Sequence, residues 1–185
     1  MFDPERFVEA CRSAVGDTDG HKAVRELVAE AVSDPGAVIE ALGEPRLGAV
    51  QILHRADDLT ILNIVWPPGM VLLPHDHRMW AVIGLYTGRE DNIYWRRLRD
   101  DETGRIEAAG ARSLGAREVL PLGRDIIHSV SNPLERATGA IHVYGGDFFA
   151  VPRSEWDPED LSERAYDVEA NLRRFETANA RLAPA

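Results

Sequence analysis

Nine short segments with the composition of β-strands follow one another between about residues 47 and 144, and they constrain the fold more than any other feature. Turn-forming residues separate them, as at Asp100–Gly104, where we expect a hairpin turn. Many short strands at close spacing are typical of a β-sandwich or a small barrel. The expected strands are Ala49–His54, Leu59–Trp66, Val71–Pro74, Trp80–Thr87, Asn92–Leu98, Arg105–Glu107, Glu118–Leu120, Ile126–Ser131 and Ala140–Tyr144.

Segments with helical periodicity flank this strand region. Asp3 and Asp34 are each followed by proline, which is typical of a helix start, and apolar residues recur at helical spacing after them. The single cysteine, Cys11, lies on the apolar stripe of the first helix, where we expect it to pack in the core. Asp157 is expected to open a C-terminal helical region, whose apolar stripe is Leu161, Ala165, Val168, Leu172, Phe175 and Leu182.

The length and charge of the chain limit its partners. The 185 residues suit one domain, with helices in 1–45, a β-barrel in 46–152 and a helical tail in 153–185. A formal net charge of −10 disfavours nucleic acid and anionic membranes. The first residues, MFDPERF, carry acids where a secretory leader would carry positive charge, so we expect no leader. No apolar run is long enough to span a membrane, and one cysteine fits a reducing compartment. We therefore expect a cytoplasmic monomer or homodimer.

Two histidines, His75 and His77, lie two residues apart in the apolar stretch GMVLLPHDHRMWAVIGLYTG. Residues i and i+2 of an extended strand point to the same face, so the two imidazoles lie side by side and Asp76 points the other way. Buried imidazoles without partners are costly, and a shared divalent metal would satisfy both. Two surface histidines before a turn are the alternative explanation.

The spacing around this pair resembles the first motif of the cupin superfamily, from Gly69 to Gly88. The segment from Gly115 to Asn132 resembles the second motif, with four residues instead of two between its last glycine and its histidine. The resemblance implies an all-β core, namely a double-stranded β-helix (jelly-roll) barrel with N-terminal helices and a C-terminal helical tail. It also implies one metal ion inside the barrel, held by His75, His77 and His128.

The glutamate that usually supplies a fourth cupin ligand is missing, because Ala81 and Val82 occupy its positions. Three neutral ligands leave the charge of the metal uncompensated and positions open for an anionic, chelating substrate. Three-histidine ferrous sites of this kind are the mark of thiol dioxygenases among cupins. The stretch HDHRMWAVIGLYTGRE is similar to the metal-binding strand of bacterial mercaptopropionate dioxygenases. Ala81 also replaces the cysteine that is crosslinked to the active-site tyrosine in mammalian cysteine dioxygenase.

The segment AIHVYGGDF resembles the S-x-H-x-Y segment of the same family. The resemblance implies that the Tyr144 hydroxyl steadies oxygen or thiolate near the iron and that His142 orients this tyrosine. Ala140 stands where the family has serine, so the outer link of the network is lost or replaced by water. A histidine and a tyrosine that are satisfied inside a barrel, without a catalytic role, are the alternative.

A substrate that carries a carboxylate needs a partner for it. Mercaptopropionate dioxygenases have a glutamine on an early strand, and the nearest counterpart here is Gln51, with Arg55 as a second choice. Arg153 falls where the bacterial family has an arginine, and a guanidinium can bind a carboxylate in a bidentate manner. A structural or surface role is the alternative for each of the three.

The sequence thus predicts a non-haem iron(II) thiol dioxygenase that uses O2 to convert a small thiol, similar to mercaptopropionate or cysteine, into its sulfinate. Imidazoles also bind nickel, manganese and zinc, so another metal-dependent cupin oxidase or lyase on the same three histidines remains an alternative. The alanine at position 140 keeps a changed reaction open. A non-catalytic cupin that binds a small molecule is the third reading.

Overall fold

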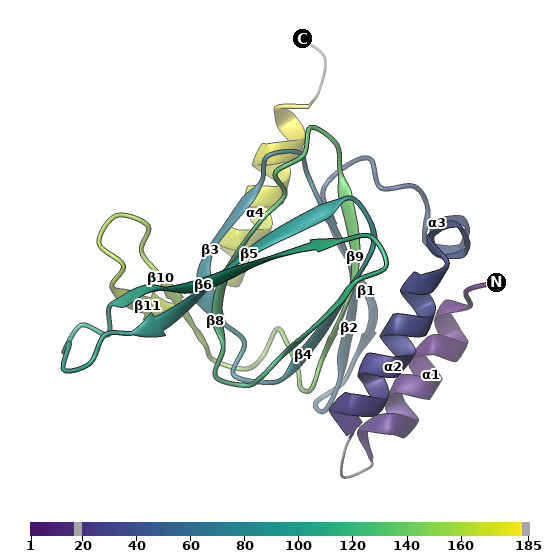
Figure 1. Cartoon of the computed structure of the whole chain (residues 1–185), viewed down its shortest axis with the longest axis horizontal. Coiled ribbons are helices and arrows are strands. Elements are labelled where there is room, and N and C mark those ends of the chain that lie inside the picture. Colours follow the sequence, from purple (N-terminus) through teal and green to yellow (C-terminus); the bar gives the residue numbers. More distant parts are fainter. Residues whose placement is uncertain (17–19, 183–185) are drawn as a thin grey trace.

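The computed structural model of the protein describes residues 1–16 and 20–182 and consists of two antiparallel β-sheets with helices outside them (Figure 1). One sheet has the strand order β1 (Ala49–Arg55), β2 (Thr60–Trp66), β9 (Thr138–Tyr144), β4 (Ala81–Thr87) and β7 (Val119–Leu122). The other has the order β11 (Glu163–Ala165), β10 (Ser154–Trp156), β3 (Val71–Asp76), β8 (Ile127–Ser131), β5 (Arg89–Arg97) and β6 (Ile106–Gly115).

Successive strands from β2 to β10 alternate between the two sheets, and only the β5–β6 hairpin interrupts the alternation. The two sheets enclose a continuous apolar core, to which β2 contributes Leu62, Ile64 and Trp66. This winding is that of a double-stranded β-helix, or jelly roll. The predicted fold class is confirmed.

Three N-terminal helices, α1 (Pro4–Val15), α2 (Gly20–Ser33) and α3 (Pro35–Leu42), cover the outer face of the β1–β2–β9–β4–β7 sheet (Figure 1). Outward-facing residues such as Ile61 and Val143 pack against them, which explains why β2 and β9 are buried along their whole length. Asp3 and Asp34 cap α1 and α3, and Cys11 packs in the interface between helices and sheet, both as predicted.

The β5–β6 hairpin contains the predicted turn at Asp100–Gly104, in which Asp101 accepts hydrogen bonds from the backbone N–H groups of Thr103 and Arg105. The second strand of this hairpin is much longer than expected. The residues in the middle of this strand are mostly small and exposed, so they lack the apolar alternation that predicts a strand. Their extended conformation comes from pairing with β5.

The prediction that a helix opens at Asp157 is wrong. The chain instead forms the short hairpin β10–β11, closed by a hydrogen bond from the Asp157 N–H to the Ser162 carbonyl. The helix α4 (Val168–Ala180) begins only after Asp167, whose side chain caps it. The apolar residues at Leu161 and Ala165 have helical spacing by coincidence, because they belong to a hairpin. The second half of the expected stripe does form a helix, and its Phe175 packs on the barrel.

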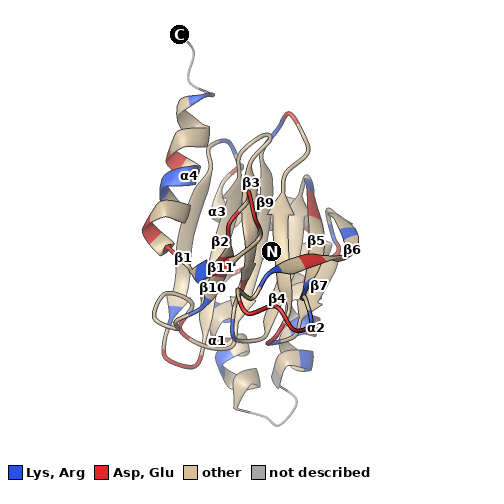
Figure 2. Cartoon of the chain, turned by 90° about the vertical axis from the view of Figure 1, so that its left-hand side faces the viewer, with Lys and Arg blue, Asp and Glu red and all other residues tan. Residues whose placement is uncertain are grey.

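Charged residues of both signs lie along α4, in the loops and on β5, whereas β2, β4 and β9 carry none (Figure 2). Within residues 1–16 and 20–182, no helix has the length and apolar character needed to cross a bilayer.

Candidate metal centre

Three histidines from neighbouring strands converge inside the barrel. His75 of β3 pairs in register with His128 of β8, and His77 follows the end of β3. The Nε2 atom of His77 lies 3.2 Å from Nε2 of His75 and 3.3 Å from Nε2 of His128. All three residues are at most 3% exposed. The structure thus brings together the three predicted ligands.

Hydrogen bonds at the other ring nitrogens orient two of these imidazoles. His75 Nδ1 lies 2.8 Å from the Leu73 carbonyl oxygen, and His128 Nδ1 lies 2.7 Å from Oδ1 of Asn92. Both oxygens are acceptors, so each Nδ1 carries the proton and each Nε2 offers a lone pair. Burial lowers the pKa of His75 to about 4 and holds the pKa values of His77 and His128 well below the ordinary value, so the cluster is neutral at physiological pH.

Three neutral imidazoles with lone pairs facing one point are costly without a shared partner, and they fit a divalent transition metal. Among the described residues, this cluster contains no carboxylate or thiolate. Ala81, where a cupin glutamate would be expected, lies beside Tyr144 on paired strands and offers only a methyl group. The donor set is therefore three imidazoles, with room for further ligands.

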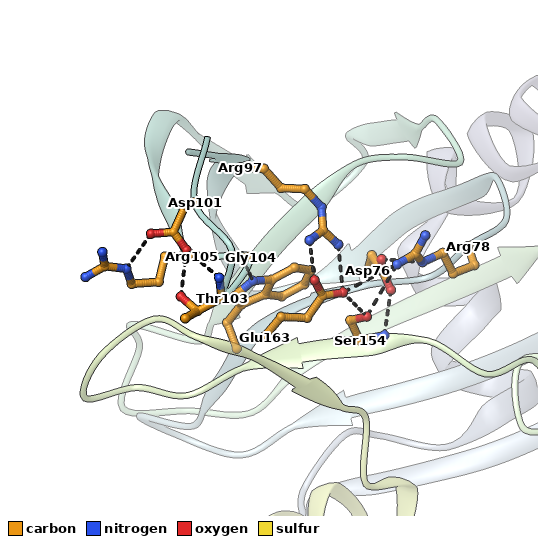
Figure 3. A network of polar contacts seen from close by, with 10 residues as sticks. Asp76, Arg78, Arg97, Asp101, Thr103, Gly104, Arg105, Ser154 and Glu163 are labelled. Atoms are coloured by element: carbon orange, nitrogen blue, oxygen red, sulfur yellow. Dashed lines mark hydrogen bonds and ion pairs between the residues drawn. The ribbon is translucent and has the colours of Figure 1, made fainter. Parts of the chain in front are cut away.

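Asp76, between the candidate ligands His75 and His77, points away from them as predicted and contacts the β10 strand (Figure 3). Its carboxylate accepts a hydrogen bond of 2.9 Å from the Ser154 N–H and pairs with Arg78 Nε at 2.6 Å. Glu163 of β11 in turn binds Arg97 of β5. These contacts fix the β10–β11 hairpin, and with it the chain that follows, against the strand that carries the metal ligands.

The histidines open onto a cavity between the barrel and α4. Its wall is mainly aliphatic and aromatic, and outside the histidine cluster its polar side chains are those of His142, Tyr144, Tyr166, Asn171 and the indole of Trp66. The apolar lining residues are Val50, Ile64, Leu72, Val130, Phe148, Phe149, Val168, Leu172 and Phe175. Such a wall excludes water and strengthens electrostatic interactions at the metal centre.

His142 and Tyr144 lie on β9 with both side chains toward this cavity. His142 Nδ1 is 2.9 Å from the Tyr144 hydroxyl, and the Tyr144 ring contacts His77 edge-on with ring centroids 5.1 Å apart. Burial lowers the pKa of His142 to about 3 and raises that of Tyr144, so both are neutral. Ala140 is fully buried in the barrel core, so this position, where the sequence resemblance leads one to expect a serine, carries a methyl group in an apolar setting.

None of the three residues predicted to bind a substrate carboxylate lines the cavity, and Gln51 and Arg55 lie away from it. Gln51 pairs with Asn63 on the outer face of the sheet and accepts a hydrogen bond from its amide, while its neighbour Val50 faces the cavity. Arg55 is half exposed and pairs with Asp147 at 2.9 Å. The structure therefore does not bring these two residues together with the histidines.

Arg153 does not itself line the cavity, but it packs against two aromatic side chains that do. Its guanidinium lies between the rings of Phe148 and Tyr166, 4.0 Å and 4.1 Å from their centroids, and it donates to the Phe148 carbonyl. The residue is only 6% exposed, yet its Nε and Nη2 atoms have no hydrogen-bond partner. A buried cation with free donors is a site for an anion.

Two polar residues of β5, Glu90 and Asn92, project into the barrel and are absent from the predicted site. Glu90 is fully buried, and its Oε1 accepts a hydrogen bond of 3.0 Å from Asn92 Nδ2. The expected strand began only at Asn92, which left Glu90 in a turn. The signal that would have found the pair is the i, i+2 spacing of two polar residues on a strand that continues to Arg89. Tyr166, which follows β11, was missed because that segment was expected to be helical.

No protein-family model matches the chain. A solved RmlC-like cupin with a double-stranded β-helix fold from Methanocaldococcus jannaschii is similar over 56% of this chain and 84% of its own, with 12% identity and a TM-score of 0.44. Bacillus subtilis oxalate decarboxylase, studied for its Mn(II) centres, is similar over 50% of this chain, with 18% identity and a TM-score of 0.39. A formate complex of the Lactobacillus farciminis enzyme has 17% identity over 50% of this chain, with a TM-score of 0.39. The chain matches only 22% and 25% of these two decarboxylase chains.

Proposed function

We propose that the protein is a non-haem iron(II) thiol dioxygenase that oxidises a small thiol carrying a carboxylate to its sulfinate with O2. The observation that carries this proposal is the set of three buried, neutral imidazoles that converge without an acidic ligand. Such a set leaves a divalent metal with its positive charge and with open positions, which favours an anionic substrate such as a thiolate.

Iron would be held by Nε2 of His75, His77 and His128, and it would supply the redox chemistry that joins both atoms of O2 to sulfur. The protein's own part is binding, orientation and exclusion of water. The apolar wall of the cavity keeps the sulfur in a dry environment. The Tyr144 hydroxyl, beside His77, is placed to hydrogen-bond a molecule in the cavity.

Arg153 supports the carboxylate part of the proposal. Its two unpartnered nitrogens lie between Phe148 and Tyr166, which both line the cavity. A carboxylate at this wall would complete the hydrogen bonding of the guanidinium and neutralise a buried charge. Only one aromatic ring separates Arg153 from the histidines. The ring of Tyr166 contacts the Arg153 guanidinium and also contacts His75, with ring centroids 5.7 Å apart. A short chain between sulfur and carboxylate is therefore expected.

The test is oxygen uptake by protein loaded anaerobically with iron(II), with mercaptopropionate, cysteine and cysteamine as substrates. We expect one O2 consumed per thiol, a sulfinate product, and loss of uptake in His128→Ala. His21→Ala is the matched control, because His21 is exposed on α2 far from the cluster. No uptake with any thiol, in protein shown to hold iron, would contradict the proposal; turnover with nickel or manganese instead would favour the other metal-dependent cupin enzyme.

A further inference from the structure

A polar path inside the barrel leads from the ligand His128 to Tyr144. Asn92 joins His128 to Glu90 through hydrogen bonds of 2.7 Å and 3.0 Å. On the other side of Glu90, its Oε2 faces His142 Nε2 at 4.0 Å, and His142 Nδ1 reaches the Tyr144 hydroxyl at 2.9 Å. Glu90 is thus the only carboxylate on this path, and it is fully buried.

Two atoms in the middle of this path have no hydrogen-bond partner, namely Glu90 Oε2 and His142 Nε2. Both are buried, and each faces the other. Unpaired buried polar atoms are rare because each costs the free energy of its desolvation. At 4.0 Å the two atoms lie just beyond hydrogen-bond range, and one proton shared between them would satisfy both.

We propose that Glu90 is the proton acceptor of the metal centre, reached from the cavity through Tyr144 and His142. This role rests on the proposed function, in which the substrate thiol gives up a proton as it becomes a thiolate. Neither Tyr144 nor His142 gains or loses net charge in the transfer, because each accepts one proton and passes on another.

Before the proton transfer, Glu90 is ionised and accepts from His142 Nε2–H, while His142 Nδ1 accepts from the Tyr144 hydroxyl. The S–H bond of the thiol then breaks and its proton adds to the Tyr144 oxygen; the former hydroxyl proton moves to Nδ1, and the Nε2 proton moves to Glu90. After it, Glu90 is a neutral acid, His142 is the other tautomer, and a thiolate remains in the cavity.

The electrostatics of the surroundings agree with this assignment. Burial raises the pKa of Glu90 to about 7, opposed by the hydrogen bond from Asn92 and by the nearby indole N–H of Trp66, and assisted by the charge of Asp91. The pKa of His142, about 3, keeps this residue neutral, so it can pass protons only by changing its tautomer. The other titratable groups near Glu90 are Tyr94 and Tyr144, whose pKa values are raised, so both stay neutral.

The direct test is the tautomer of His142, read from imidazole ¹⁵N chemical shifts in zinc-loaded, diamagnetic protein as pH is raised through about 7. We expect the protonated nitrogen to change from Nδ1 to Nε2 as Glu90 ionises. In Glu90→Gln the amide donates to Nε2 at every pH, so Nδ1 should stay protonated. Asp91→Asn is the matched control, because Asp91 precedes Asn92 on the same strand and pairs with exposed Arg89. It should keep the tautomer change, at a slightly lower pH because the charge of Asp91 is lost.

Absence of a tautomer change in the wild type would overturn the proposal, and this holds even if Glu90→Gln does not fold. A tautomer change that persists in Glu90→Gln would also overturn it. Because the titration uses neither thiol nor O2, it is independent of the proposed function.

A second measurement is the pH profile of kcat/KM for thiol oxidation. This value should rise through about pH 7 in the wild type and be at least about 10-fold lower and independent of pH in Glu90→Gln. If the tautomer change occurs but no thiol is oxidised, the role of Glu90 as proton acceptor stands and the dioxygenase proposal is contradicted.

Discussion

The Nδ1 atom of His128 lies 2.7 Å from Oδ1 of Asn92, a residue on the neighbouring strand β5. This contact fixes the tautomer of the imidazole and aims its Nε2 at the other two histidines. The amide's other end donates to Glu90, so one side chain links a candidate metal ligand to the buried carboxylate behind it.

Replacement of Asn92 by alanine should weaken metal binding. His128 would lose the acceptor that orients it, and outer partners of this kind are worth about 10- to 100-fold in metal affinity. Competition with a chromophoric chelator measures the effect for zinc or iron(II). Asn179→Ala is the control, since Asn179 bonds to the backbone of Gly48 at the far end of α4. Equal affinities of the two variants would show that Asn92 does not support the ligand.

The stability of the protein should depend on pH through Glu90. Its pKa is raised from 4.5 to about 7 by folding, so the folded state holds a proton that the unfolded state has lost between these values. The stabilisation is therefore complete below pH 4.5 and is lost as the pH rises through about 7. Glu90→Gln lacks this loss, and should gain on the order of 3 kcal/mol relative to wild type between about pH 5 and about pH 8. Urea unfolding at both pH values checks this; a constant difference would mean that Glu90 is ionised in the folded protein throughout.

Arg153→Met should raise KM for mercaptopropionate by about 10- to 100-fold, the value of a charge-assisted contact, and leave KM for cysteamine, which has no carboxylate, nearly unchanged. Arg55→Met is the matched control, because its partner is Asp147 outside the cavity. The measurement is steady-state oxygen uptake with each thiol. An equal rise for both thiols would indicate that Arg153 only holds Phe148 and Tyr166 in place.

Gly84 should be needed for the packing of the N-terminal helices on the barrel. A Cβ atom built there lies 2.4 Å from a methyl carbon of Val28 on α2 and 3.0 Å from one of Val32. Gly84→Ala should therefore lower the free energy of unfolding by about 1–3 kcal/mol through overpacking. Gly110→Ala on the exposed strand β6, where the nearest atom is 3.9 Å away, is the control. Identical urea midpoints for the two variants would show that α2 moves aside without cost.

Local patterns predicted the barrel and its three histidines well. Side chains alternate between the two faces of a strand, so His75 and His77 lie on one side and Asp76 on the other, independently of the tertiary structure. The same period brings His142 and Tyr144 together. Helix caps such as Asp34 are equally local, because the carboxylate bonds to N–H groups within the next three residues.

Features that depend on distant pairing could not be predicted in this way. Alternation divides β1 into two faces but does not say which one is inside, and Gln51 proved to lie on the outer one. The partnership of Asn92 with His128 depends on the register between β5 and β8, which the sequence of neither strand states alone. The β10 strand forms because Glu155 pairs with His75, eighty residues earlier by position, and its own three residues carry no strand pattern.

The central claim is that both atoms of O2 are transferred to the sulfur of a thiol at the three-histidine centre. The most direct measurement is mass spectrometry of the product formed from mercaptopropionate or cysteine by iron(II)-loaded protein under ¹⁸O₂. We predict a sulfinate in which both added oxygens carry the label, and none of this product from His128→Ala. A disulfide product, or a sulfinate whose oxygens come from water, would contradict the claim.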